Sequence, residues 1–290
     1  MSFIDRAFIQ QTRQIDLSNG VRLSYLDQGM SHQNCLVFIH GLGSFKGAWW
    51  ELMQELQHQF RCIAIDLPGF GDSSKGLPAY ELPFFVECVT QFVAQLQLTD
   101  VYLCGHSMGG QVSLAMALEK QINIKGICLL ASAGIETFTL ADREKLFQTF
   151  NVENYLSLSE TQLRQLMELN FYHADNHFAQ VLVKERLAQR DEENYHQRVE
   201  AIIQSVKSML NHPVYQKLPE LHLPTLIIYG ENDQLIPNKK LHPSLSISTI
   251  MASASQQLPQ AACYVLPQCG HFPQVDQLQK VSELITEFAR

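Results

Sequence analysis

The chain has 290 residues, of which 46% are hydrophobic and 17% charged, a composition typical of a globular protein with one large core or two modest ones. Its net charge of -8 argues against the basic surfaces that bind nucleic acid or anionic membranes. No apolar run approaches the roughly 20 residues needed to span a bilayer, and residues 1–14 lack the apolar stretch of a secretory signal, so we expect a cytoplasmic protein with no membrane span and no nucleic-acid partner.

The seven cysteines predict free thiols. Their number is odd, no two are spaced as CxxC, and several lie inside apolar runs. Buried thiols in a reducing compartment explain this pattern better than disulfides or a zinc site, so no metal is expected.

The first predicted structural unit is a hairpin near the N-terminus. The strand-like runs Arg13–Leu17 and Val21–Gln28 are separated by Ser18, Asn19 and Gly20. An Asn-Gly pair between two such runs is a strong signal for a tight turn. We therefore expect the sheet to begin with an antiparallel pair.

The rest of the chain predicts an α/β fold with a mostly parallel sheet. Apolar runs without polar alternation are typical of strands covered on both faces, and strands that alternate with helices imply parallel pairing with right-handed crossovers. The expected buried strands are Cys35–Ile39, Arg61–Ile65, Val101–Cys104, Lys125–Leu130, Thr225–Tyr229 and Ala262–Leu266. The expected helices are Trp49–Gln59, Pro83–Leu96, Gly110–Lys120 and Gln277–Phe288.

Residues 135–218, here called the insertion, differ from the rest of the chain. They are richer in Glu, Gln, Asn and Arg, and their apolar residues recur at helical spacing, as in Leu163, Leu166, Met167 and Phe171. This pattern predicts helices inserted between two strands of the sheet. The expected organisation is a core formed by residues 1–134 and 219–290, interrupted by a helical unit at 135–218.

The strongest chemical signal is the G-x-S-x-G pattern centred on Ser107. It follows an apolar run and precedes a helix-like stretch, which is the context in which such a serine sits on a sharp strand-to-helix turn. Gly105 and Gly109 would let neighbouring backbone approach the strained turn without a clash. We expect Ser107 to be a nucleophile at the N-terminus of a helix.

A serine hydroxyl needs a base, and His271 is the best candidate. It follows the last strand-like run, in the chain order serine, acid, histidine that suits this kind of turn. His106 is expected to point away from its neighbour Ser107. Seven further histidines lie in polar settings and are expected to be solvated: His58, His173, His177, His196, His212, His222 and His242.

The acid that orients the base is expected on the loop after Thr225–Tyr229. Asp233 is the first choice there and Glu231 the second, because a carboxylate on this loop can reach the loop that holds His271. The loop after the preceding strand has no carboxylate before Glu136. Its absence there supports Asp233.

Acyl transfer also needs donors for a developing oxyanion. The run Cys35–Ile39 ends in His40-Gly41-Leu42-Gly43. The backbone amides of Leu42 and Met108 are the expected pair of donors.

A competing interpretation is a dinucleotide-binding loop. Residues 41–47 form a Gly-rich turn between a strand and a helix, and the next strand ends in Asp66. Pro68 and Gly69 follow that acid at once, a hairpin precedes the supposed first strand, and this interpretation leaves Ser107 unexplained. Saturable binding of NADH would support it.

Taken together, these motifs resemble the α/β-hydrolase fold family, in a form with a serine nucleophile and a helical cap, similar to esterases and lactonases. The resemblance rests on His40-Gly41, on the stretch Asp66–Ser73, on the Ser107 turn, and on Asp233 and His271. It implies a triad of Ser107, Asp233 and His271, and a cap formed by residues 135–218. It also implies that no cofactor is needed.

The resemblance leaves the reaction open, because a fold does not determine a function. The first expectation is a carboxylic ester hydrolase that cleaves a small ester or related acyl bond through an acyl-enzyme on Ser107. The same triad could serve carbon–carbon cleavage or cofactor-free oxygen chemistry, or a receptor could keep it as a vestige. Dehalogenases and epoxide hydrolases of this fold use an aspartate nucleophile, so Ser107 argues against both.

Overall fold

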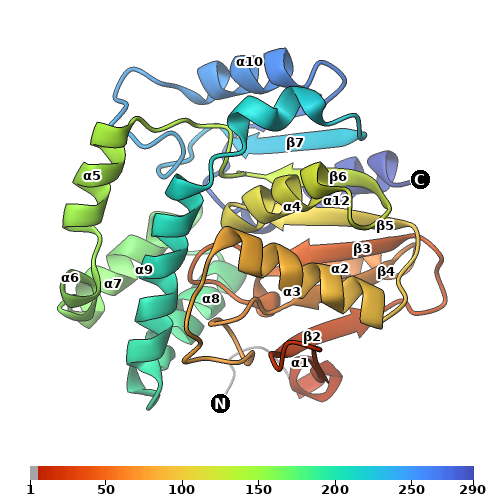
Figure 1. The fold of residues 1–290 in the computed structure, drawn as a ribbon, viewed down its shortest axis with the longest axis horizontal. Helices are drawn as coiled ribbons and strands as arrows, with labels where there is room; N and C mark the ends of the chain where they lie inside the picture. The colour runs from red at the N-terminus through yellow and green to blue at the C-terminus, as the bar shows by residue number, and fades with distance from the viewer. Residues whose placement is uncertain (1–5) are drawn as a thin grey trace.

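The computed structural model describes residues 6–290, and over that range an eight-stranded sheet runs through the molecule (Figure 1). The strand order is β1-β2-β4-β3-β5-β6-β7-β8. The strands are β1 Arg13–Asp16, β2 Arg22–Gln28, β3 Cys35–Ile39, β4 Arg61–Ile65, β5 Val101–His106, β6 Ile124–Leu130, β7 Thr225–Gly230 and β8 Ala262–Leu266. The pairs β1–β2 and β2–β4 are antiparallel and all later pairs are parallel, which confirms the predicted fold class and its N-terminal hairpin.

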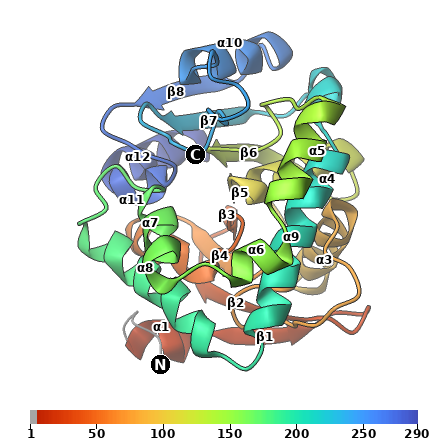
Figure 2. The ribbon, with the colours of Figure 1, turned by 90° about the vertical axis from the view of Figure 1, so that its left-hand side faces the viewer.

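Helices cover both faces of the sheet. Those of the core are α1 Arg6–Gln11, α2 Trp50–Leu56, α3 Leu82–Gln95, α4 Met108–Glu119, α10 Ile247–Gln257, α11 Pro273–Asp276 and α12 Leu278–Phe288. In Figure 2, α3 and α4 lie on one side of the sheet and α12 on the other. Because both faces are covered, the central strands can be apolar at every position: β3 and β7 are buried throughout.

The strand β8 differs from its prediction. Its bounds are those expected, yet Tyr264 is 38% and Val265 43% exposed. The reason is its place at the edge of the sheet, where β7 is its single neighbour among the described strands. An apolar run by itself does not distinguish an edge strand from a central one.

The insertion contains five α-helices between β6 and β7. They are α5 Leu140–Thr149, α6 Val152–Leu156, α7 Glu160–Glu168, α8 His177–Ala188 and α9 Tyr195–Asn211. Four begin with side chains that accept backbone N–H groups of the first turn, at Thr139, Asn151, Ser159 and Asn176, and so start where a cap is available. Figure 1 shows these helices beyond the carboxyl ends of the parallel strands, where ligands bind in open α/β sheets.

Two further features bear on the sequence-based expectations. All seven cysteines are unpaired, and six of them are buried while Cys263 is partly exposed. Within residues 6–290 no helix is both long enough and apolar enough to cross a lipid bilayer.

Candidate active site

The turn at Ser107 is strained and tightly packed. Its backbone has φ 51° and ψ −115°, a conformation that L-residues rarely adopt. A Cβ on Gly105 would lie 2.4 Å from the Gly109 carbonyl oxygen, and one on Gly109 would lie 2.1 Å from that of Ile39. Both glycines are therefore required by backbone contacts. The turn places Ser107 between the end of β5 and the first residue of α4.

His271 and Asp233 form a buried hydrogen-bonded pair. The distance from His271 Nδ1 to Asp233 Oδ2 is 2.8 Å, and the residues are 3% and 4% exposed. Asp233 Oδ1 accepts the amides of Leu235 at 2.8 Å and Ile236 at 3.0 Å. These bonds fix the carboxylate, and they leave His271 Nε2 as the ring nitrogen free for chemistry.

Glu231, the second choice for the acid, is exposed on the same loop. Its backbone amide donates to the carbonyl of Leu266 at 2.9 Å. The structure thus brings Asp233, and not Glu231, to His271.

Ser107 and His271 line one cavity of about 390 Å³. The wall also contains Leu42, together with apolar side chains of the insertion such as Leu146, Phe150 and Met209. The cavity is of the size that accepts a small organic molecule.

The turn that carries Leu42 lies against Ser107. A Cβ on Gly41 would be 3.1 Å from Ser107 Cβ and 2.7 Å from His106 Nδ1. Met108 is the first residue of α4, so its amide is among those that lack a partner inside the helix. Leu42 and Met108 thus both belong to segments next to Ser107.

A buried network of ion pairs and hydrogen bonds fixes the segment that follows the Leu42 turn. Lys46 is fully buried, and its Nζ lies 2.8 Å from Asp66 Oδ2 and 2.6 Å from Asp72 Oδ2. Its backbone amide donates to Asp66 Oδ1 at 2.6 Å. Burial opposes the charge of Lys46, but the two carboxylates raise the pKa of its ammonium group above the usual value.

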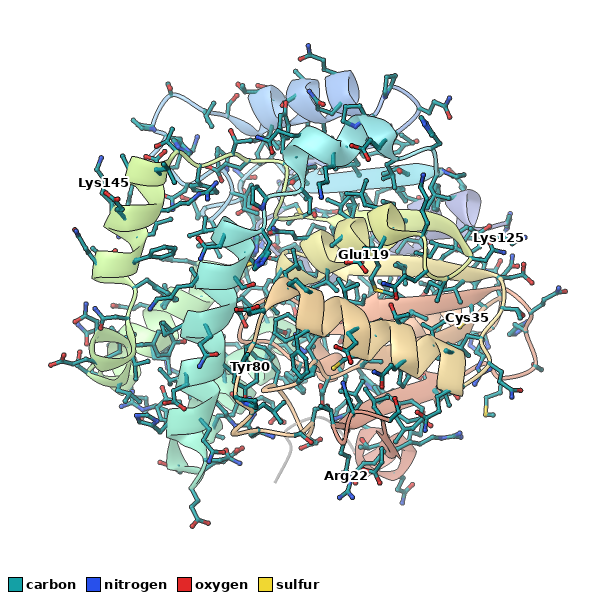
Figure 3. The ribbon with its side chains drawn as sticks, viewed as in Figure 1. Arg22, Cys35, Tyr80, Glu119, Lys125 and Lys145 are labelled. Atoms are coloured by element: carbon teal, nitrogen blue, oxygen red, sulfur yellow. The ribbon has the colours of Figure 1, made fainter. Side chains whose placement is uncertain are left out.

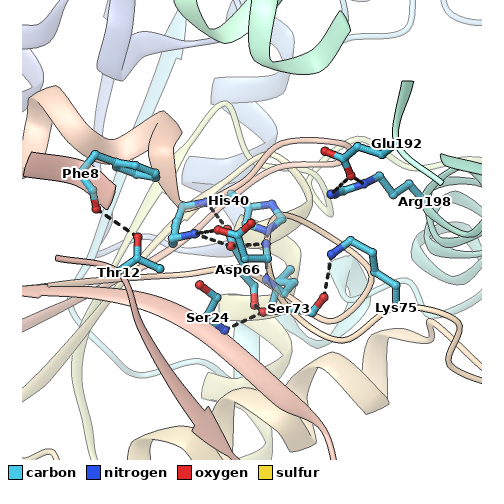
Figure 4. A network of polar contacts seen from close by, with 12 residues as sticks. Phe8, Thr12, Ser24, His40, Asp66, Ser73, Lys75, Glu192 and Arg198 are labelled. Atoms are coloured by element: carbon cyan, nitrogen blue, oxygen red, sulfur yellow. Dashed lines mark hydrogen bonds and ion pairs between the residues drawn. The ribbon is translucent and has the colours of Figure 1, made fainter. Parts of the chain in front are cut away.

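The same network extends to His40 and Ser73. His40 Nε2 accepts the amide of Leu67 at 3.0 Å, and Ser73 Oγ donates to the Asp66 carbonyl at 2.7 Å (Figure 4). The acid that a dinucleotide site would use for a ribose, Asp66, is therefore fully buried and bound to Lys46. This arrangement weighs against the dinucleotide interpretation.

Two residues, His106 and Asp276, contact the segment of the base in a way that the sequence did not predict. His106 Nε2 lies 2.7 Å from the carbonyl of His271, and burial lowers the pKa of His106 well below its usual value, so the ring is neutral and donates through Nε2–H. Asp276 accepts the amide of Gly270 at 2.8 Å. His106 belongs to the G-x-S-x-G pattern, but nothing in the pattern indicates a contact across 165 residues of chain.

His242 was expected to be solvated, and this prediction is wrong. Its Nδ1 lies 2.5 Å from Glu136 Oε1, and its Nε2 lies 3.5 Å from Asp142 Oδ2. Burial acts to lower the pKa of His242, but the hydrogen bond and charge of Glu136, with Asp142, raise it overall. The pair joins the loop after β7 to the start of the insertion.

Within the described part of the chain, no group of three or more His, Cys, Asp or Glu side chains is placed to hold a metal ion. The cavity is lined by the Ser107 hydroxyl and the His271 imidazole, and the Asp233 carboxylate is hydrogen-bonded to that imidazole. Such a set suits proton transfer and nucleophilic attack.

Comparison with known proteins gives a family match over most of the chain. The model of the alpha/beta hydrolase fold family matches residues 34–278. The 2-hydroxymuconate semialdehyde hydrolase of Pseudomonas sp. (strain CF600) is 26% identical, over 94% of this chain and 92% of that protein. A pimeloyl-[acyl-carrier protein] methyl ester esterase of Nitrosospira multiformis is 27% identical, over 88% of this chain and 94% of that protein.

The solved structure of a probable hydrolytic enzyme from Pseudomonas aeruginosa PAO1 has a similar fold. It superimposes with a TM-score of 0.83 and 21% identity, covering 96% of this chain and 94% of that one. The likeness supports the arrangement of sheet and helices described above.

Proposed function

This chain belongs to the alpha/beta hydrolase fold family, and on that premise we propose that it is a serine hydrolase that cleaves a small carboxylic ester or a related acyl bond. The observation that carries the proposal is the buried His271–Asp233 pair, whose histidine lines the same cavity as a serine on a strained turn. The relative named as a methyl ester esterase supports an ester as the substrate.

In the proposed mechanism, His271 Nε2 takes the proton of Ser107 as its Oγ attacks the carbonyl carbon. Asp233 accepts the Nδ1–H of His271 and stabilises the imidazolium that forms. The amides of Leu42 and Met108 bind the oxyanion. His271 then gives its proton to the leaving alcohol, and a water molecule, activated by the same histidine, releases the acid from Ser107.

We propose that the insertion, residues 135–218, is a helical cap over a core of residues 1–134 and 219–290, of which residues 1–5 lie outside the described part. Helices α5, α6, α7, α8 and α9 supply side chains to the cavity wall. A cap of this kind excludes water and shapes the pocket for the substrate.

The test is pre-steady-state hydrolysis of a short-chain para-nitrophenyl ester. We expect a burst of nitrophenol from the wild-type protein. The burst should vanish in Ser107→Ala, with a fall in kcat on the order of 10⁶-fold, because the hydroxyl, imidazole and carboxylate act as one unit. Circular dichroism of the variant checks that it is folded. Unchanged turnover in Ser107→Ala would mean that another group is the nucleophile.

A second candidate is carbon–carbon bond hydrolysis by the same three residues. It is favoured by the relative that is named for a semialdehyde substrate. There His271 with Asp233 would act mainly as a base, and Ser107 would matter less. In the same assays, a much larger loss for His271→Ala than for Ser107→Ala would favour this reaction over the acyl-enzyme.

A further inference from the structure

The cavity wall contains an arginine that has no acidic partner. Arg186, on α8, is 5% exposed. Its Nη1 donates to Gln189 Oε1 at 2.6 Å and its Nη2 to the Tyr155 hydroxyl at 2.8 Å, both neutral acceptors. Its buried Nε has no hydrogen-bond partner, and no Asp or Glu among residues 6–290 forms an ion pair with it. The guanidinium also lies over the Tyr155 ring, with Cζ 5.8 Å from the ring centroid, so its charge is buried against neutral groups and has no anionic partner among the described residues.

A second buried arginine of the insertion, in contrast, has an acidic partner. Arg198, on α9, is 6% exposed, almost the same as Arg186. It is paired with Glu192, whose Oε2 lies 2.5 Å from its Nη2 (Figure 4). Burying an arginine without such a partner is costly, and Arg186 bears that cost at the wall of the cavity.

Arg186 lies beside the turn that holds the expected oxyanion donor. A Cβ on Gly43 would be 3.7 Å from Arg186 Nε and 3.8 Å from its Nη2. Ser107 and His271 line the same cavity. An anion bound at Arg186 would therefore be part of a molecule that also reaches the reacting groups.

The cavity has another cation at its α5 wall. Arg143 lines it too, and its Nε is buried without a partner, although the side chain as a whole is half-buried. Lys145, labelled in Figure 3, lies on the outer side of α5, and Arg143 two residues earlier faces nearly the opposite way. Figure 2 shows α5 and α8 at opposite sides of the insertion.

The carboxylates near the cavity are already bound to other groups. Glu136 accepts the amide of Asn238 and contacts His242, and Asp233 is bound to His271. Neither carboxylate forms an ion pair with Arg186, so no anion among the described residues contacts its guanidinium. A neutral ester would leave the guanidinium without an anionic partner.

We propose that the substrate carries a free carboxylate besides its scissile acyl bond, and that the guanidinium of Arg186 binds it. The planar fork of a guanidinium matches a carboxylate, and ion pairing inside a largely apolar cavity is stronger than in water. This inference rests on the proposed function and narrows it to acid-bearing esters. Arg143, being partly solvated, contributes a smaller attraction of the same sign.

The experiment compares charged esters with capped ones. The first series is the monomethyl against the dimethyl esters of straight-chain dicarboxylic acids from succinic to azelaic acid, followed by pH-stat titration. The second series places the charge on the alcohol side of the scissile ester. It compares O-acetyl hydroxy acids, which have a free carboxylate, with the methyl esters of the same compounds. We expect at least one charged series to have a kcat/KM at least about tenfold above its capped partner.

Variants assign the preference to one residue. Arg186→Gln should lower kcat/KM for the preferred charged ester by about 10- to 100-fold and for its capped partner by less than about threefold. Arg186→Lys should recover part of the loss, because it restores charge without the fork. Arg198→Gln is the matched control: it removes an equally buried guanidinium outside the cavity wall and should keep the preference.

Calorimetric binding separates this inference from the proposed function. The same monomethyl and dimethyl esters are titrated into Ser107→Ala, where no turnover is needed. Preference for the charged ester, lost in a Ser107→Ala, Arg186→Gln double variant, supports the inference even if the wild-type protein hydrolyses no ester. No preference in either series, or a preference that Arg186→Gln leaves intact, would overturn it.

Discussion

At the scale of single residues, Lys46 carries a positive charge at a fully buried position. Its ammonium group is matched by Asp66 and Asp72, and a Cβ on Gly71 would lie 2.1 Å from the Asp66 carboxylate. The loops after β3 and β4 are therefore tied together just behind the turn that carries Leu42. The buried pair is a positioning device that is costly to break from one side.

We expect Lys46→Met to lower the free energy of unfolding by about 3–5 kcal/mol, because Asp66 keeps a buried charge without its cation. Urea denaturation followed by fluorescence measures the loss. The control is Lys75→Met. Lys75 is only half-buried and its Nζ donates to the Ser73 carbonyl at 2.9 Å, so its loss should cost less than about 1 kcal/mol. Equal losses in the two variants would contradict the role given to the Lys46–Asp66 pair.

The residue-scale features differ in how far the sequence could predict them. Asp233 and His271 follow apolar strands directly, so the fold alone implies that their loops meet. Arg186 and Asp276 acquire their roles from partners on distant segments, and no local pattern indicates those contacts. Lys46 was noted only as part of a Gly-rich loop, since nothing in a sequence shows that a lysine will be fully buried.

At the scale of elements, the loop after α7 is attached to the loop that carries the base. Asp276 Oδ2 accepts the amides of Gly270 at 2.8 Å and Tyr172 at 2.9 Å, and its Oδ1 accepts that of His173 at 3.2 Å. The amide of His271 donates to the Asn170 carbonyl at 2.7 Å. The insertion thus helps to set the position of the base.

Replacing Asp276 tests this attachment. Asp276→Asn keeps the shape but loses an acceptor, so we expect faster hydrogen exchange at Tyr172 and His173 and a fall in kcat of about tenfold, with KM nearly unchanged. Asp175→Asn is the matched control, since this aspartate is exposed on the same loop. If exchange accelerates while kcat stays at the wild-type value, the attachment does not position the base.

The contact between Glu136 and His242 should make the junction of insertion and core depend on pH. The pKa of His242 is raised in the folded protein, so the protonated ring stabilises the fold; this contribution is complete below the unfolded value near about 6.5 and is lost as the pH rises through the folded value. Burial raises the pKa of Glu136, the partner of His242, above its usual value.

We therefore expect the stability difference between the wild-type protein and His242→Gln to shrink by about 1–2 kcal/mol as the pH is raised from about 6 to about 9. Urea denaturation at a series of pH values measures it. His222→Gln, which replaces an exposed histidine, controls for the loss of a histidine as such. A difference that grows with pH would show that the sign is wrong.

The sequence predicts the bounds of an element well where its apolar residues form a continuous run, and poorly where the element has few apolar residues. The bounds of β3, β4 and β8 agree with the sequence because each is a compact apolar run between polar turns. Helix α10 was not predicted, since Ser, Ala, Thr and Gln make up most of Ile247–Gln257 and its apolar stripe is short. The insertion was recognised as helical, but its path depends on packing that the sequence does not show.

At the scale of the whole molecule, the net charge of the chain does not describe the charged groups at its cavity. The chain as a whole is acidic, whereas the cavity wall carries two arginines without acidic partners among the described residues. Salt screens the distant surface charges but scarcely affects groups inside the pocket. The global charge, read from composition, therefore argues against nucleic acid and membranes and says nothing about the charge of the substrate.

The hydrogen bond from the amide of His271 to the Asn170 carbonyl restricts how a substrate can enter the cavity. If the segment around Asn170 moved away from the core to admit a substrate, the hydrogen bond to the amide of His271 would break. The base would then be out of position until the segment returned. Entry of the substrate near α5 would leave the Asn170–His271 hydrogen bond intact. Substrate binding would then not disturb the position of the base.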